Sequence, residues 1–260
     1  MRIAIFTLEA LAAAEAVSRF IAAEAGRIAL VGLSDPYRPA MGGMFGQTWR
    51  HVRRSGIGVL PYLAANFSLP PIANALGRGP VLPGSMARRH GIPVLRVGDV
   101  NGTALHGALR AHGIDLILSF HFDQIFRAET LAVPAFGGIN VHPSLLPHHR
   151  GPVPTLHALA DGGPFGVTIH RLAPKIDAGA VLAQAELTPP PGLSSIGVAA
   201  FAHLAALELL PAVLGDITAA GQVVETMPYR GFPSRAELAS LYRKGGAANW
   251  GDVAMGVKGR

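Results

Sequence analysis

Short apolar segments alternate with amphipathic segments along most of the chain, and this alternation is the strongest constraint on its fold. The stretch from Ala10 to Ala25 places its apolar residues on one face of a helix. Strands that alternate with helices are typical of a mostly parallel sheet with helices on its faces. We therefore predict an α/β, Rossmann-like fold. The predicted strands are residues 2–6, 28–33, 93–97, 115–119, 138–142, 167–172 and 180–187.

The length and the N-terminus limit the organisation of the chain. Its 260 residues have room for one large core, and half of them are hydrophobic, which excludes a disordered chain. We predict a main domain over residues 1–190, followed over residues 191–260 by a helix and a C-terminal extension packed on the core. Glu9 and Glu15 interrupt any apolar run near the N-terminus, so we expect no signal peptide and a cytoplasmic protein.

The most informative motif begins in the fifth predicted strand. It reads Asn-Val-His-Pro-Ser-Leu-Leu-Pro from Asn140, and Asp177-Ala-Gly follows further along. Asn140 offers an uncharged amide donor, His142 can move a proton near neutral pH, and Asp177 can orient the imidazole or carry the proton onward. This combination suits attack of an amine on a carbonyl carbon, with Asn140 steadying the oxyanion. Each residue taken singly is more often a turn or structural residue.

Other features of the sequence narrow the kind of site. Ligands of parallel sheets bind beyond the carboxyl ends of the strands, so we expect residues 121–126 and 140–147 to meet there. The first strand leads into Thr7-Leu8-Glu9 and not into a glycine loop, which disfavours a dinucleotide. Without cysteine, the chain has no thiolate site. Adjacent His148 and His149 lack a third ligand at useful spacing, so we expect no metal.

Taken in order, four elements resemble the formyltransferase family that uses 10-formyltetrahydrofolate. They are the motif at Asn140, Arg150-Gly-x-x-Pro, Gly166-Val-Thr-x-His and Asp177-Ala-Gly, and the resemblance covers about residues 92–184. The ordered combination is far more specific than any one piece. It implies an N-formyltransferase whose catalytic domain is residues 1–190 and whose co-substrate is 10-formyltetrahydrofolate.

The resemblance implies a role for each site residue. Asn140 would bind the formyl oxygen, His142 would take part in proton transfer, and Asp177 would work with a water or with His142. Residues 120–126 align with the family's pterin loop, with His121 in place of a glycine. The predicted folate contacts are His121, Phe122, Gln124, Ile125, Phe126, Gly138 and Ile139; the acceptor contacts are Ser144, Arg150 and Gly151; and Thr168 and His170 would support Asp177.

Several of these roles have plainer alternatives in the sequence. Residues 120–126 can also be interpreted as the end of a strand that faces the core. Arg150 suits a phosphate or carboxylate, or else an ion pair within the loop. Thr168 and His170 alternate with apolar residues, as on the polar face of a half-buried strand. How His142 and Asp177 would divide the proton transfer stays open.

The same resemblance bears on the acceptor. The residues around Arg150 and Gly166 are closer to the amino-sugar and methionyl-tRNA branches than to the glycinamide ribonucleotide branch, and the tail is too short for the extra domain of the tRNA enzymes. We expect an amino sugar on a nucleotide or lipid carrier, and nucleic acid is disfavoured. The alternatives are a formyltetrahydrofolate hydrolase, a glycinamide ribonucleotide or methionyl-tRNA formyltransferase-like activity, and a non-catalytic membrane- or RNA-associated protein.

Residues 36–90 stand apart from the rest, where the family has a modest connection. They carry seven arginines and no Asp or Glu, in a chain whose net charge is +6. Residues 55–77 are uncharged and largely apolar, with prolines that argue against a spanning helix. An apolar stretch with basic edges fits peripheral association with an anionic membrane. The alternatives are a buried helical lid or a contact between two copies in a homodimer.

Overall fold

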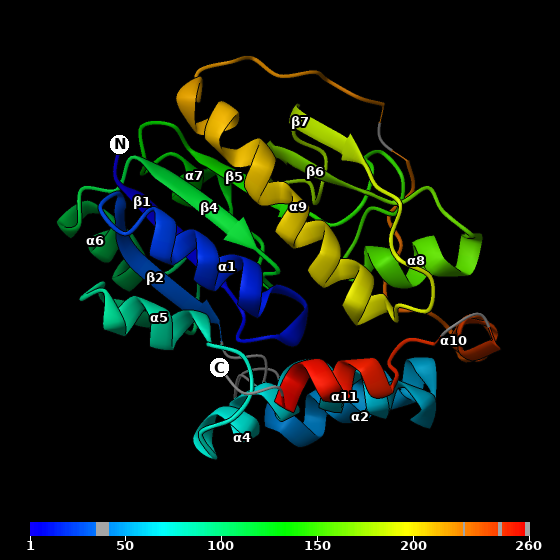
Figure 1. The fold of residues 1–260 in the computed structure, drawn as a ribbon. Helices are drawn as coiled ribbons and strands as arrows, with labels where there is room; N and C mark the ends of the chain where they lie inside the picture. The colour runs from blue at the N-terminus through cyan, green and yellow to red at the C-terminus, as the bar shows by residue number, and fades with distance from the viewer. Residues whose placement is uncertain (35–41, 226, 244–245, 258–260) are drawn as a thin grey trace.

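The fold is built on one seven-stranded sheet (Figure 1). The computed structural model describes residues 1–34, 42–225, 227–243 and 246–257. The strand order is β3-β2-β1-β4-β5-β6-β7. The strands are β1 (Ile3–Thr7), β2 (Ile28–Ser34), β3 (Val94–Val97), β4 (Leu116–Phe120), β5 (Gly138–His142), β6 (Gly166–Arg171) and β7 (Val181–Glu186).

The first five strands are parallel, and the last two are antiparallel to their neighbours. Strands β1 and β4 lie in the middle and are buried throughout. Apolar side chains on both faces of these strands are what a sheet covered on two sides requires. The predicted α/β class with a mostly parallel sheet is therefore confirmed.

Helices cover both faces of the sheet. One face carries α1 (Leu11–Ala23), α5 (Pro83–Arg89) and α9 (Ser195–Gly215). Their apolar residues form the main core with the inner residues of the strands, including Val17, Leu118 and Ala206. Helices α6 (Thr103–Ala111) and α7 (Ala128–Leu131) cover the other face, around Phe6.

Helix α9 is long and apolar enough to cross a membrane by length and composition alone. Half of its most apolar window is buried inside the protein, against α1 and β6. Core helices of globular proteins have the same character. Its first turn is capped by Ser194, whose Oγ accepts a hydrogen bond from the Gly197 amide at 3.0 Å.

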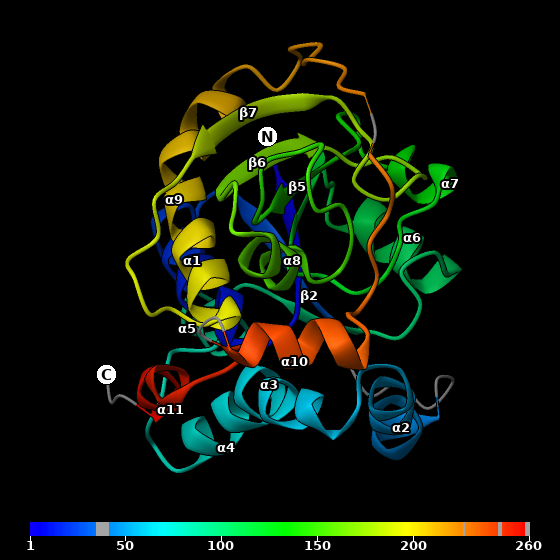
Figure 2. The same ribbon diagram turned by 90° about the vertical axis from the view of Figure 1, so that its right-hand side faces the viewer.

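The connection between β2 and β3 forms a separate helical layer below the sheet (Figure 2). It packs with α8, α9 and the C-terminal helices around a second apolar core that includes Val59, Tyr62 and Leu241. The layer consists of α2 (Gly43–Ser55), the 3-10 turn η2 (Ile57–Val59), α3 (Leu60–Leu63), the π-helical turn η3 (Ala64–Ser68) and α4 (Leu69–Ala75); the other helices are α8 (Pro154–Asp161), α10 (Arg235–Arg243) and α11 (Trp250–Val257).

Asn66 ties this layer to the main domain. Helix α1 has no side-chain cap of its own, and the fully buried Asn66 Oδ1 accepts a hydrogen bond from the Ala12 amide at 3.0 Å. An unpaired amide in the first turn of a helix would otherwise need water or a ligand. The layer thus completes the N-terminus of a helix more than fifty residues earlier in the chain.

The structure modifies two expectations. Leu63 and Phe67 pack against the second core, as expected of a lid, while Leu60 of the same apolar run is exposed. The sequence from about Gly221 also predicts a short strand, and the structure has there only a single antiparallel bridge between Val181 and Gln222. Residues 36–41, with Arg38, lie outside the described residues. The domain boundary near residue 190 stays a prediction.

Candidate functional site

The register of the sheet brings the motif residues together. Asn140 and His142 occupy alternate positions at the end of β5 and therefore share one face of the sheet. The antiparallel pairing of β5 with β6 sets Asn140 opposite His170 and His142 opposite Thr168. Side chains at paired positions are close enough to interact directly.

Asn140 and His170 form a hydrogen bond of defined direction. The Nδ1 of His170 lies 2.8 Å from the carbonyl oxygen of Arg171, which can only accept. Burial, the largest effect, lowers the pKa of His170 to about 4, so the ring is neutral at pH 7 and its Nε2 is an acceptor. The Nδ2 of Asn140 donates to it at 3.1 Å. The amide nitrogen keeps a second hydrogen for a ligand.

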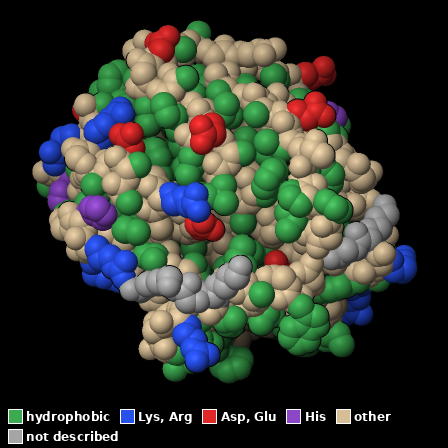
Figure 3. Space-filling model, viewed as in Figure 1, with side chains coloured by type: hydrophobic (Ala, Val, Ile, Leu, Met, Phe, Trp, Pro, Cys, Tyr) green, Lys and Arg blue, Asp and Glu red, His purple; other side chains and the backbone are tan. Residues whose placement is uncertain are grey.

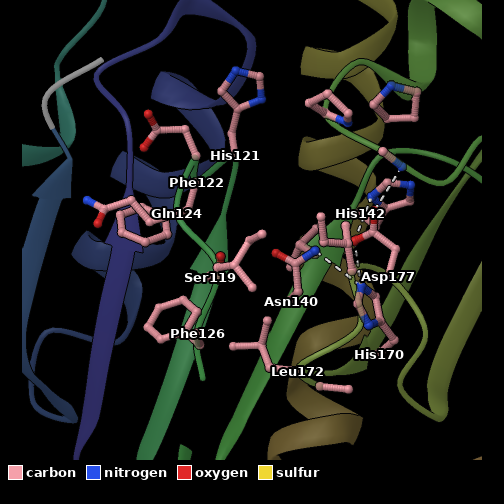
Figure 4. Close-up of a pocket in the computed structure, with 18 of the residues that line it drawn as sticks. Ser119, His121, Phe122, Gln124, Phe126, Asn140, His142, His170, Leu172 and Asp177 are labelled. Carbon is pink, nitrogen blue, oxygen red and sulfur yellow. Dashed lines mark hydrogen bonds and ion pairs between the residues drawn. The ribbon is translucent and has the colours of Figure 1, made fainter. Parts of the chain in front are cut away.

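Asp177 stands between the two histidine rings (Figure 4). Its Oδ1 lies 3.6 Å from the Nδ1 of His142 and 3.6 Å from the Nε2 of His170. Its Oδ2 accepts a hydrogen bond from the Gly151 amide at 2.9 Å. The backbone φ of Asp177 is +46°, a conformation that few residues other than glycine adopt. Asn140, His142 and Asp177 therefore converge on one point.

His142 is held from both ends of its ring. It is buried, and its Nε2 lies 3.3 Å from the carbonyl oxygen of His149, while its Nδ1 faces Asp177. His149 has a positive φ of +54°, which turns that carbonyl inward. The loop after β5 thus orients the imidazole toward the carboxylate.

Arg150 does not face the cavity, contrary to the predicted acceptor contact. It is buried and donates to three backbone carbonyls: Asp177 at 3.0 Å, Met227 at 2.7 Å and Ile176. The rigid fork of the guanidinium suits several acceptors held in one plane. Arg150 therefore fixes the backbone of the Asp177 loop. Gly151 does line the cavity, and a side chain there would collide with the carbonyl of Arg230.

Ser144 and Thr168 are likewise engaged within the protein. This corrects the predicted acceptor contact of Ser144, while the support of Asp177 by Thr168 stays a prediction. The Ser144 hydroxyl donates to the carbonyl of His148 at 2.9 Å. The Thr168 hydroxyl donates to the carbonyl of Ser144 at 2.7 Å and accepts from the Leu146 amide at 3.1 Å. Both residues are buried, and neither lines the cavity. They hold the motif loop in shape, whereas His170 does contact Asp177.

The predicted pterin loop forms the opposite wall of the cavity (Figure 4). Phe122 and Phe126 stack with ring centroids 5.4 Å apart, and Ile125 is exposed at the rim. Gln124 lines the cavity, but its amide is already bonded. It donates to the Ser34 hydroxyl and the Val97 carbonyl and accepts from the Val100 amide. Gln124 thus fastens the loop to the ends of β2 and β3.

Two predicted folate contacts lie elsewhere. Gly138 and Ile139 are buried in β5 and do not line the cavity. A side chain at Gly138 would come within 2.6 Å of Leu172, so this glycine is required for packing. His121, in contrast, lines the cavity and has a φ of +46°. That backbone conformation explains why a glycine suits this position in related loops.

The cavity between these walls has a volume of about 250 Å³. It opens at the carboxyl ends of β4 and β5, where α/β sheets bind their ligands. Among the described residues, no group of three or more His, Asp or Glu side chains could hold a metal ion. The polar groups that converge here are an amide, an imidazole and a carboxylate.

Residues 95–214 match the model of the family described as formyl transferase. This stretch contains the pterin loop, the Asn140 motif and the Asp177 loop. This stretch, a little under half of the chain, belongs to the formyl transferase family.

The curated relatives of this family member are named methionyl-tRNA formyltransferases. The one from Chloroflexus aggregans is 41% identical over 106 residues, which is 40% of this chain and 34% of the relative. The one from Anaeromyxobacter dehalogenans is 35% identical over 185 residues, which is 67% of this chain and 55% of the relative. The chain thus spans about a third of the first relatives it matches.

A solved structure supports the fold of this formyl transferase family member. A sugar N-formyltransferase from a Shewanella species superposes with a TM-score of 0.55, covering 89% of this chain and 77% of that one. The two sequences are 20% identical, so the likeness concerns the fold.

The structure adds residues that the sequence did not indicate. Leu172, Ile176 and Tyr229 complete the cavity. Tyr229 belongs to the C-terminal segment, about fifty residues after Asp177. No local sequence pattern predicts that it lines this cavity. Leu172 and Ile176 come shortly before Asp177 in the sequence. This proximity was the one indication that they line the cavity.

Proposed function

We propose that this protein transfers a formyl group from 10-formyltetrahydrofolate to a primary amine. The observation that carries the proposal is the convergence of Asn140, His142 and Asp177 on one cavity at the end of β5. Family membership supports the reaction class. The order of these residues along the chain matches the resemblance on which the prediction rested.

The shape of the cavity fits a flat, partly polar ring. Phe122 and Phe126 offer an apolar wall on one side, and Leu172 lies on the other. A pterin needs such a slot together with backbone donors and acceptors along its edge. The folate would place its formyl group toward Asn140 and supply the carbon that is transferred.

The side chains suit each step of the transfer. The neutral amine nitrogen attacks the formyl carbon, a carbon–nitrogen bond forms, and the formyl oxygen becomes an oxyanion. The second Nδ2 hydrogen of Asn140 is free to donate to that oxygen. Asp177, with His142 at 3.6 Å, takes up the proton that the amine loses. The bond from the carbon to folate N10 then breaks, and N10 gains a proton.

We propose an amino sugar on a nucleotide or lipid carrier as the acceptor. The closer agreement of the Arg150 and Gly166 motifs with the amino-sugar and methionyl-tRNA branches supports this class. The relatives named methionyl-tRNA formyltransferases share only part of their length with this chain, so their acceptor does not carry over.

Alanine substitutions test the reaction. The assay would follow 10-formyltetrahydrofolate consumption with methyl glycosides of 3-amino- and 4-amino-deoxyhexoses as amines. Asn140→Ala, His142→Ala and Asp177→Ala should each lower the rate roughly a hundredfold or more. The unreactive 5-formyltetrahydrofolate should still raise the melting temperature of each variant by mass action.

Three outcomes would count against the transferase. Full activity of a stably folded His142→Ala variant would remove this mechanism. Formate release at the same rate without any amine would favour a hydrolase. Absence of both turnover and a thermal shift with 5-formyltetrahydrofolate would favour a binding protein of the same fold.

A further inference from the structure

A second cavity adjoins the candidate active site and is walled by the segment between β2 and β3. We call it the insertion cavity; its volume is about 460 Å³. It shares His121, Phe122, Asp123, Pro152 and Tyr229 with the first cavity, so the two are adjacent. The other lining residues are Leu8, Gln47, Thr48, His51, Tyr62, Leu63, Phe67, Val153 and Phe232.

The walls of the insertion cavity are mostly aromatic or aliphatic. No Lys or Arg from the described parts of the chain lines it, and Asp123 at the shared edge is its one acidic residue. Burial, followed by repulsion from Arg50 and Arg54, lowers the pKa of His51, so this ring is neutral at pH 7. Phosphate and carboxylate groups are bound by Arg, by Lys or by a helix N-terminus. These walls offer no cation for such a group.

Two helices, α1 and α8, begin beside this cavity, and the N-terminus of α1 is unavailable to an anion. Helix α1 starts just after Leu8, which lines the cavity. The Ala12 amide is bonded to Asn66, and the amides of Ala13 and Ala14 are bonded to the carbonyl of Ala10. Glu9, beside that turn, adds a negative charge. The N-terminus of α1 is therefore closed by the protein itself, whereas α8 begins at the lining residue Val153 without a side-chain cap.

One polar atom of a lining residue lacks a partner. The side-chain Nε2 of Gln47 is buried and has no hydrogen-bond partner in the structure. A buried donor left unpaired costs about 1–3 kcal/mol, and a ligand oxygen would recover this cost when the Gln47 side chain turns its amide into the cavity. An uncharged hydroxyl or ether oxygen meets that need without a cationic wall.

We propose that the insertion cavity is the acceptor subsite, and that it admits a primary amine on an uncharged body with ring or alkyl faces. This inference rests on the proposed formyl transfer. Because the cavity joins the first one at His121 and Asp123, an amine entering from it reaches the carbon held near Asn140. Among the described residues, the walls offer no Lys or Arg to a phosphate close to the amine. In a carrier-linked sugar, the phosphate would remain outside.

Ligand-observed NMR in the presence of 5-formyltetrahydrofolate tests this assignment. The probes are benzylamine and methyl 4-amino-4-deoxyglucoside, compared with phosphoethanolamine and glucosamine 6-phosphate. We expect the two uncharged-body amines to bind and the two phosphorylated amines to bind at least tenfold more weakly. Thr48→Trp should fill the cavity and weaken the first pair at least tenfold, whereas Ala75→Trp on the exposed side of α4 should not.

A second variant keeps the test decisive if Thr48→Trp fails to fold. Gln47→Leu should weaken the amino glucoside several-fold and leave benzylamine unchanged, because benzylamine has no oxygen to accept from Gln47. Tighter binding of the phosphorylated amines, or no effect of Thr48→Trp and Gln47→Leu, would overturn the subsite. Failure of the whole reaction is distinguished by the thermal shift with 5-formyltetrahydrofolate, which reports on binding of the donor and needs no acceptor.

The outer side of the same layer carries an independent feature. Several large apolar side chains there are exposed: Phe45 by 85%, Trp49 by 66%, Ile57 by 76% and Leu76 by 73%. In Figure 3, hydrophobic side chains are exposed along the lower edge of the molecule with Lys or Arg beside them, while α2 lies behind α11 in this view. Apolar patches of this kind mark interaction sites.

The charged residues of the helical layer all have one sign. The exposed arginines of the layer include Arg50 and Arg53 on α2, next to Trp49, and Arg78 after α4. No Asp or Glu occurs between residues 36 and 90. Trp and Phe between arginines on one helix face are typical of helices that lie in the headgroup region of a membrane.

From this second observation we infer that the outer face of α2 docks on an anionic phospholipid surface. Its inner side lines the insertion cavity through Gln47, Thr48 and His51, so docking leaves the core of the protein intact. The attraction is expected to need anionic lipid and to weaken with salt, because exposed charges are screened within about 8–10 Å at 0.1–0.15 M.

Vesicle co-sedimentation tests the docking face. Vesicles with phosphatidylserine should bind the protein at least tenfold better than pure phosphatidylcholine vesicles, and high salt should release it. Trp49→Ser and the pair Arg50→Gln and Arg53→Gln should each reduce binding about tenfold, while Val223→Ser, which removes an exposed apolar residue elsewhere, should not. Equal binding to neutral vesicles, no binding at low salt, or a dimer in solution that Trp49→Ser abolishes would overturn the inference.

Discussion

The side-chain amide of Asn140 donates to the Nε2 of His170 across the antiparallel pair β5–β6, at 3.1 Å. The same Nε2 lies 3.6 Å from Asp177. Because the His170 ring is neutral and its other nitrogen is bonded to a backbone carbonyl, the direction of the bond to Asn140 is fixed. One histidine therefore sets the orientation of the amide that would hold the formyl oxygen.

The first prediction follows from that bond. His170→Leu should lower kcat for formyl transfer, because the Asn140 amide loses the acceptor that orients it. The loss should stay below the roughly hundredfold effect of removing the amide itself. His170→Gln, whose side-chain oxygen can accept from Asn140, should recover part of the rate. Steady-state kinetics at matched pH would measure both variants.

The control is the affinity for the donor. KM for 10-formyltetrahydrofolate and the thermal shift with 5-formyltetrahydrofolate should change little in His170→Leu. Equal losses in kcat for the Leu and Gln variants, or a change confined to KM, would show that His170 acts only through packing.

The sheet was predictable from the sequence because its central strands are buried on both faces. Runs such as residues 3–6 and 116–118 leave no other place for so many apolar side chains. The helical layer was harder to predict. Its apolar residues divide between an inner side that packs on the second core, with Tyr62, and an outer side that is exposed, with Ile57. Hydrophobicity alone does not separate the two sides.

The candidate site was also predictable only in part. Asn140, His142 and Asp177 converge as expected, because they sit at strand ends and in a loop whose positions the sheet determines. Arg150 and Ser144 were assigned to the acceptor on residue type, and the structure turns both toward backbone carbonyls. Side-chain direction in a loop depends on tertiary partners such as Met227 and His148, which no local pattern reveals.

The second prediction concerns Arg150. Arg150→Lys should lower both activity and stability, because an ammonium cannot reach the carbonyls of Ile176, Asp177 and Met227 together. Each buried carbonyl left unpaired costs about 1–3 kcal/mol. Chemical denaturation would measure the stability, and formyl transfer would report any displacement of Asp177.

A contrasting substitution separates this structural role from a role in acceptor binding. If Arg150 bound an anionic acceptor, Arg150→Lys would raise KM for that acceptor and leave stability unchanged. Such a result would contradict the position described for Arg150.

The third prediction concerns pH. Burial, with a smaller contribution from His121, lowers the pKa of the fully buried His203 to about 3, against an ordinary value of 6.5. Between these two values the unfolded chain binds a proton that the folded protein does not. The stability that depends on neutral His203 is therefore complete above pH 6.5 and is lost as pH falls toward 3, at up to about 1.4 kcal/mol per pH unit.

His203→Gln should remove this contribution, so the free energy of unfolding should fall less steeply between pH 6.5 and 4. The exposed His90 offers a matched control, since His90→Gln should keep the slope of the parent protein. Urea denaturation at several pH values would give both slopes. An unchanged slope in His203→Gln would mean that this ring is not kept neutral by burial.

The last prediction concerns the backbone at His121, where φ is +46°. The ring stacks on Phe67, with centroids 6.1 Å apart, and its Nε2 lies 3.4 Å from the Nδ2 of Asn66. A left-handed backbone costs a residue with a side chain about 1–2 kcal/mol, and glycine avoids that cost. The contacts of His121 with the helical layer therefore offset the strain in its backbone.

Comparing two substitutions at His121 separates the backbone strain from the contacts of the ring. His121→Ala removes the ring and keeps the strain, whereas His121→Gly removes both, so the Gly variant should be more stable than the Ala variant by about 1 kcal/mol. In an ordinary helix or strand the order would be reversed, because glycine loses more conformational entropy on folding. Urea denaturation of the two variants under identical conditions gives the difference directly. An Ala variant equal to or more stable than the Gly variant would show that residue 121 does not adopt a positive φ in solution.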